Sequence, residues 1–196
     1  MGGAVSMQFA ADYADDVRGL ILVESVGIRG HLFWGRDKRG CPIPDELLKT
    51  REDIAGDAAI LKTVNAIAEK NKAFLKAVWN NLIYIHTPPD PERYAAYMEE
   101  TLKQRNSVDV YHALTTFNIS DESNGIVSGN GEVHKIEMPA LIIQGENDPV
   151  IPEETGKEIA AGIGDNAELV ILKNCGHSPT TDSLPELIRL FVEFMN

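Results

Sequence analysis

The fold is decided by residues 140–149, ALIIQGENDP, where a continuous apolar run ends in a polar loop. Such a run is typical of a strand buried on both faces of a parallel sheet. The same pattern recurs at residues 167–179, AELVILKNCGHSP, and at residues 19–25, GLILVES. Helical patterns precede the last of these runs and follow the other two, from about Pro152 and over residues 184–195. This alternation predicts an α/β fold with a parallel sheet covered by helices.

The middle of the chain has a different pattern. Apolar residues between Leu61 and Leu82 recur at three- and four-residue steps, which is typical of a helix with one buried face. Asp90-Pro91 predicts the start of another helix, and Ser107 is expected to cap a further one. We therefore predict a mainly helical lid, residues 27–134, without any strong strand. It is inserted into an α/β core made of residues 1–26 and 135–196.

Two polar residues follow consecutive predicted strands. Asp148 comes after the strand at 140–145, and His177 follows the strand at 167–172, 29 residues later. Alone, an Asp before Pro is usually a turn residue, and a His after Gly is usually just exposed. Adjacent parallel strands lie about 4.8 Å apart and their carboxyl ends meet at one edge, where active residues gather. The pair therefore predicts a carboxylate that orients an imidazole.

Four segments carry a resemblance to a known family. Residues 145–152, GENDPVIP, look like an acid loop, and residues 175–179, CGHSP, look like a histidine loop. Residues 1–5, MGGAV, look like the stretch after the serine in G-x-S-M-G-G, and residues 15–25 look like the next helix end and strand. In this order they resemble the α/β-hydrolase family over essentially the whole chain. The resemblance implies a Ser–Asp–His triad with Asp148 as the acid and His177 as the base.

The same resemblance implies what the sequence lacks. The nucleophilic serine would directly precede Met1, and the backbone N–H of Met1 would be one oxyanion donor. We therefore expect the C-terminal part of a hydrolase, with N-terminal strands missing and little activity of its own. Ser6, Ser25 and Cys175 are alternative nucleophiles, but none is expected on a strand-to-helix elbow. Glu24, at the end of the first strand, is an alternative acid.

The sequence also suggests a substrate class. Met-Gly-Gly after the elbow resembles serine esterases, lipases and lactonases, which implies a small carboxylic ester as substrate and an acyl-enzyme intermediate. The aromatic residues that could line its pocket are Phe33, Trp34, Trp79, Tyr84 and Tyr111. The alternative is a non-catalytic interaction or regulatory protein derived from a hydrolase.

Composition limits the kinds of partner that the chain is expected to bind. The net charge is −12, which argues against nucleic acid or an anionic membrane, and no apolar run is long enough to span a bilayer. Two cysteines without CxxC spacing fit reduced thiols in the cytoplasm. No metal cluster or phosphate-binding glycine loop is apparent, so neither a metal nor a cofactor is expected. Without a neighbouring strand, residues 19–25 would form an exposed edge, which predicts self-association.

Overall fold

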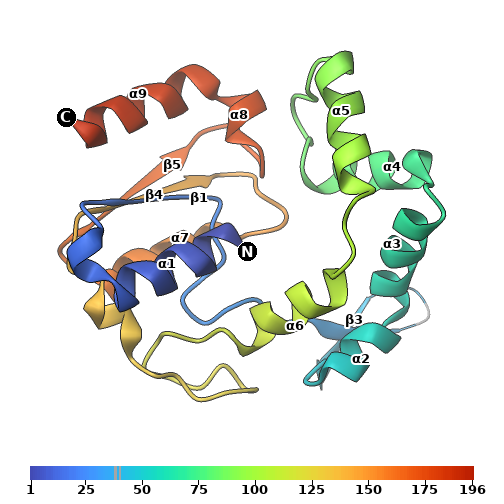
Figure 1. Ribbon diagram of the computed structural model, residues 1–196, viewed down its shortest axis with the longest axis horizontal. Helices are drawn as coiled ribbons and strands as arrows, with labels where there is room; N and C mark the ends of the chain where they lie inside the picture. Colours follow the sequence, from blue (N-terminus) through green and yellow to red (C-terminus); the bar gives the residue numbers. More distant parts are fainter. Residues whose placement is uncertain (38, 40) are drawn as a thin grey trace.

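The computed structural model describes residues 1–37, 39 and 41–196. Within them, β1 (Leu20–Val23), β4 (Ala140–Gly145) and β5 (Ala167–Leu172) form a parallel sheet in the order β1-β4-β5 (Figure 1). All six residues of the central strand β4 are buried, as its continuous apolar sequence predicts. The predicted parallel α/β sheet is thus confirmed.

Helices cover both faces of this sheet (Figure 1). On one face lie α1 (Gly2–Asp12) and α7 (Glu153–Ile163), which bury Met7 and Ile159 against Leu22 and Ile142. On the other face α9 (Leu184–Met195), preceded by the short α8 (Pro179–Asp182), packs Leu187 and Leu190 against alternate residues of the strands. The strands therefore bury both faces, because successive side chains point to opposite sides.

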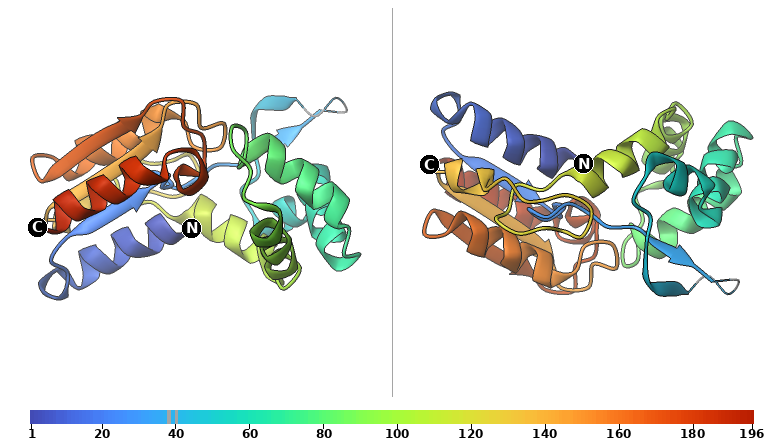
Figure 2. Two further views of the ribbon diagram at one scale, coloured as in Figure 1. Left: turned by 90° about the horizontal axis from the view of Figure 1, so that it is seen from above. Right: turned by 90° about the horizontal axis from the view of Figure 1, so that it is seen from below.

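The middle of the chain forms a second body beside the sheet (Figure 2). Its elements are β2 (Trp34–Arg36), β3 (Pro42–Leu47), α2 (Arg51–Gly56), α3 (Ala58–Ala68), α4 (Lys72–Leu82), α5 (Pro91–Thr101) and α6 (Ser107–Thr116). Residues 27–134, predicted as a lid, keep that name below. One hydrophobic cluster within them includes Leu75, Tyr84 and Tyr94, and another includes Leu48 and Ile54. Two short 3₁₀ helices, η1 (Ala14–Asp16) and η2 (Glu132–Lys135), lie with the sheet body. No helix in the described part of the chain is long and apolar enough to cross a membrane.

Three details of the lid differ from the prediction. The strands β2 and β3 form an antiparallel pair that the sequence did not signal, because both are short, mostly exposed, and contain proline or charged residues. The apolar stripe from Leu61 to Leu82 is divided between α3 and α4, with Lys70 at φ 55 between them. Ser107 is the first residue of α6, and Asn106 occupies the N-cap.

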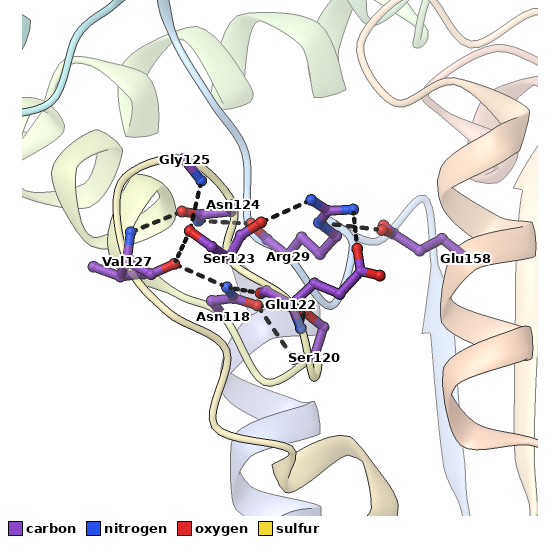
Figure 3. A network of polar contacts seen from close by, with 9 residues as sticks. All are labelled: Arg29, Asn118, Ser120, Glu122, Ser123, Asn124, Gly125, Val127 and Glu158. Atoms are coloured by element: carbon purple, nitrogen blue, oxygen red, sulfur yellow. Dashed lines mark hydrogen bonds and ion pairs between the residues drawn. The ribbon is translucent and has the colours of Figure 1, made fainter.

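The chain leaves the core near Ile28 and returns to it near Ile119, and the two passages are tied together (Figure 3). Arg29 forms ion pairs with Glu122 (3.4 Å) and Glu158 of α7 (3.8 Å). The buried Asn124 donates to the carbonyls of Arg29 and Thr115, both at 3.0 Å. Ile28 and Ile119 belong to the core cluster of the sheet body, although both fall within residues 27–134. These contacts anchor the lid to the core.

Candidate active site

The three strands end in polar residues at one edge of the sheet. Glu24 directly follows β1, Asp148 follows β4 by three residues, and His177 lies five residues beyond β5. Reactive atoms of the three side chains lie within 4.8 Å of one another. The structure therefore brings together both predicted triad residues and the alternative acid.

Asp148 holds the imidazole of His177. His177 Nδ1 lies 2.7 Å from Asp148 Oδ2, and the side chain of Asp148 is fully buried. The second oxygen, Oδ1, accepts from the backbone N–H groups of Val150 (2.7 Å) and Ile151 (3.0 Å). Burial opposes ionisation of Asp148, but hydrogen bonds from His177, Glu24 and Ile151 outweigh it and lower its pKa. An ionised Asp148 can thus fix the tautomer of His177.

The acid and histidine loops are held together through their backbones. Asn147 N donates to the carbonyl of Cys175 at 2.9 Å, and Glu146 N donates to Leu172 O at 2.9 Å. A Cβ on Gly145 would lie 2.5 Å from the carbonyl oxygen of Cys175 and 2.6 Å from that of Gly176. Only glycine permits this approach, so residue 145 sets the separation of the two loops.

Glu24 lies beside Asp148 at the same edge of the sheet. Its Oε1 accepts from Gly145 N (2.7 Å) and its Oε2 from Gln144 Nε2 (2.6 Å), and its carboxyl group also hydrogen-bonds Asp148. Burial, followed by the hydrogen bond and the charge of Asp148, raises the pKa of Glu24 to about 9. Of the two candidate acids, Asp148 is the one that hydrogen-bonds His177 among the described residues.

Glu24, Asp148 and His177 are also the group that could offer ligands to a metal ion. Both oxygens of Glu24 accept hydrogen bonds, and Asp148 Oδ2 is paired with Nδ1 of His177. A carboxylate–imidazole pair therefore describes the arrangement better than a metal site.

The alternative nucleophiles are committed elsewhere or exposed. Ser6 is exposed on α1, and the hydroxyl of Ser25 is buried and donates to the carbonyl of Val26 at 2.8 Å. Cys175 is fully buried. Burial, with the nearby charges of Glu24, Asp182 and Asp148, raises the pKa of this thiol to about 12, so it stays protonated at neutral pH. None of the three has the properties of an activated nucleophile.

A cavity of about 510 Å³ opens between this edge and the lid. The core contributes Met1, Glu24 and His177 to its wall, and the lid contributes Phe33, Trp34 and Tyr111. Two other aromatic residues suggested as pocket walls, Trp79 and Tyr84, instead pack inside a lid cluster. Met1 thus lines the same cavity as His177.

Two further residues near the site gave little signal in the sequence. His31 lines the cavity, its ring stacks edge-on against Phe33 with centroids 4.9 Å apart, and burial lowers its pKa. Asp182 Oδ2 accepts from Gly176 N (2.9 Å), and Oδ1 accepts from Thr87 N of the lid (3.0 Å). His31 lies in an irregular loop without a motif, and Asp182 lies beyond the histidine loop at residues 175–179.

Known proteins share this architecture. The family model described as alpha/beta hydrolase fold matches residues 1–182. Lipase 1 of Psychrobacter immobilis is 26% identical over 188 residues, which cover 95% of this chain and 50% of the lipase. The 2-hydroxy-6-oxo-6-phenylhexa-2,4-dienoate hydrolase of Comamonas testosteroni is 25% identical, with 100% of this chain and 60% of that enzyme covered.

Solved structures agree on the fold. The enol-lactonase from Burkholderia xenovorans LB400 superposes with a TM-score of 0.62 at 19% identity, covering 100% of this chain and 62% of the lactonase. The chain spans about half the length of the first curated relatives it matches. Since the family model matches nearly the whole chain, the protein belongs to the alpha/beta hydrolase fold family.

Proposed function

We propose that this chain supplies the acid and the base of a serine hydrolase that cleaves small carboxylic esters. Asp148 is the triad acid, His177 is the general base, and the serine directly precedes Met1. The observation that carries the proposal is the shared cavity, whose wall includes both His177 and Met1. A serine joined to Met1 would lie at the start of α1, where Met1 lines this cavity.

The proposed reaction follows from these positions. His177 Nε2 removes the serine proton while the serine oxygen bonds to the ester carbonyl carbon, and Asp148 stabilises the imidazolium. The backbone N–H of Met1 donates to the developing oxyanion. His177 then gives its proton to the departing alcohol, which leaves an acyl-enzyme. Water, deprotonated by His177, attacks the acyl carbonyl and releases the acid and the free serine.

The cavity suits an apolar acyl or alcohol group. Aromatic and aliphatic side chains make up much of its wall, including Phe33, Trp34, Leu48, Ile60 and Tyr111. A 2-hydroxy-6-oxo-dienoate is a second candidate substrate, because one relative of similar identity is named for hydrolysing such a compound. The organised Asp148–His177 pair favours either reaction over a non-catalytic role.

The test compares two purified proteins in p-nitrophenyl butyrate hydrolysis: the 196-residue chain, and a form that also contains the segment encoded upstream in the same reading frame. We expect activity only in the extended form, and we expect His177→Ala to abolish it. Equal activity in both would mean that the nucleophile lies within the 196 residues. Inactivity of the extended form towards the ester and the dienoate would favour the non-catalytic alternative.

A further inference from the structure

We propose that Glu24 is a positioning residue for the triad acid, a neutral carboxylic acid that donates a hydrogen bond to Asp148 and holds it against His177. This inference rests on the proposed function, in which Asp148 orients the general base. It gives Glu24 a role distinct from that of an alternative acid, because Glu24 acts on Asp148 and not on the imidazole.

The contacts of Glu24 join the end of β1 to the acid loop. Oε1 accepts from Gly145 N, the last residue of β4, at 2.7 Å. Oε2 accepts from Gln144 Nε2 at 2.6 Å, and the same amide donates to Ile151 O at 2.8 Å. Since Ile151 N also donates to Asp148, Glu24 and Gln144 connect the end of β1 to the residues that hold Asp148.

The protons are divided unequally between the two carboxyl groups. Asp148 and Glu24 are both buried, and their reactive atoms lie within 4.8 Å of each other. Gln144 Nε2 lies 2.6 Å from Glu24 Oε2 and 3.5 Å from Asp148 Oδ2, so the two charges would repel if both carboxyl groups ionised. Asp148 faces His177 and two backbone N–H groups, which stabilise its anion. Glu24 faces one backbone N–H and one neutral amide, together with the charge of Asp182 and the protonated thiol of Cys175. The proton therefore stays on Glu24, which makes it a donor to Asp148.

The backbone at Glu24 supports a functional role. Its φ is 45°, in the left-handed region that a residue with a Cβ adopts at a cost in free energy. Such strained residues cluster at active sites, where the surrounding structure enforces them. The strain accompanies a side chain that turns from the end of β1 onto the neighbouring loop.

The experiment uses NMR on the 196-residue chain and two variants, Glu24→Gln and Glu24→Leu. It follows the downfield proton of His177 Nδ1 in its hydrogen bond to Asp148, and the pKa of His177. Gln is neutral and can still donate to Asp148, so Glu24→Gln should keep the signal and hold the pKa of His177 within about 0.3 unit. Leu cannot donate, so Glu24→Leu should lose the signal. Glu186→Gln, which removes a carboxylate paired with Arg189 on α9, should change neither property.

Two results would overturn the inference. A pKa of His177 that falls by about one unit or more in Glu24→Gln would mean that Glu24 is ionised in the native protein. A downfield signal that persists in Glu24→Leu would mean that Asp148 stays hydrogen-bonded to His177 without a hydrogen bond from Glu24. If Glu24→Leu does not fold, the Glu24→Gln measurement still decides the protonation state. Neither measurement needs turnover, so a failed ester assay would not be mistaken for failure of this inference.

Discussion

Two buried carboxyl groups, one ionised and one protonated, meet at the edge of the sheet where the strands end. Asp148 is stabilised as an anion by His177 and by two backbone N–H groups, whereas Glu24 keeps its proton. The roles of the two acids can therefore be separated by replacing one carboxyl group at a time.

The first prediction concerns Asp148→Asn in the extended form, which also contains the upstream segment with the proposed nucleophilic serine. Asn presents a side-chain amide where the carboxylate held the Nδ1–H tautomer, so kcat should fall by roughly 10⁴-fold. Ester hydrolysis measured by stopped-flow or absorbance checks this, with Glu186→Gln on α9 as the control. A loss below about tenfold, combined with a large loss in Glu24→Gln, would make Glu24 the acid.

The second prediction concerns stability and pH. The pKa of Glu24 is about 9 in the folded state, and the unfolded chain releases this proton near pH 4.5. Between these values the unfolded state binds fewer protons, so this residue lowers the free energy of unfolding by up to about 1.4 kcal/mol per pH unit as pH rises. Glu24→Gln should remove this decline.

Urea denaturation of the wild type and Glu24→Gln at several pH values between 5 and 9 measures the difference. The two stability curves should diverge as pH increases, with the variant more stable at the alkaline end. Parallel curves would show that Glu24 has an ordinary pKa in the folded protein.

At the scale of elements, the contact between the acid and histidine loops depends on one glycine. Gly145→Ala would place a Cβ against two backbone carbonyls, which cannot move without separating the loops. We expect a loss of about 2 kcal/mol or more of unfolding free energy, and a weaker His177–Asp148 signal in NMR. Gly56→Ala is the matched control, because nothing lies within 4 Å of the added Cβ. Equal stability of both variants would contradict the prediction.

The anchor of the lid gives a further prediction. Asn124→Ala leaves the carbonyls of Arg29 and Thr115 without their donor, and the N–H groups of Ile126 and Val127 without their acceptor. We expect a cost of about 2–3 kcal/mol, because buried polar groups lose partners. Hydrogen exchange should increase at residues 117–131 while β4 stays protected. Asn65→Ala, at an exposed position on α3, should leave exchange at residues 117–131 unchanged.

The sequence predicted the strands and the acid–histidine pair because both depend on local signals. Continuous apolar runs identify β1, β4 and β5, and the loops after β4 and β5 carry Asp148 and His177. The partnership of Glu24 with Asp148 could not be predicted, since it depends on register across two strands and on a left-handed backbone. The pair β2–β3 and the cavity position of His31 were missed because neither has an apolar pattern or a motif.

At the scale of the whole molecule, β1 has a strand partner on one side only within the described part of the chain. The helix α1 beside it exposes a stripe of Val5, Phe9 and Tyr13, each at least half exposed. An open strand edge next to apolar side chains favours pairing with another copy. We therefore predict that the 196-residue chain self-associates through this side.

Analytical ultracentrifugation over a range of concentrations tests this prediction. Phe9→Lys should weaken association, because it puts a charge on the stripe. Leu61→Lys, at an exposed position on α3 of the lid, should leave it unchanged. A monodisperse monomer with a sharp thermal transition at every concentration would contradict the prediction.

The pairing of Leu20 with Ala140 also constrains how the chain is made. During synthesis β1 leaves the ribosome before β4, which appears only after the whole lid has been translated. The helices α2 to α5 contact their neighbours in sequence and can form early, whereas β1 must wait for β4. Until β4 emerges, the edge of β1 that pairs with it stays open in the nascent chain, and such apolar strand edges are the kind of segment that chaperones bind.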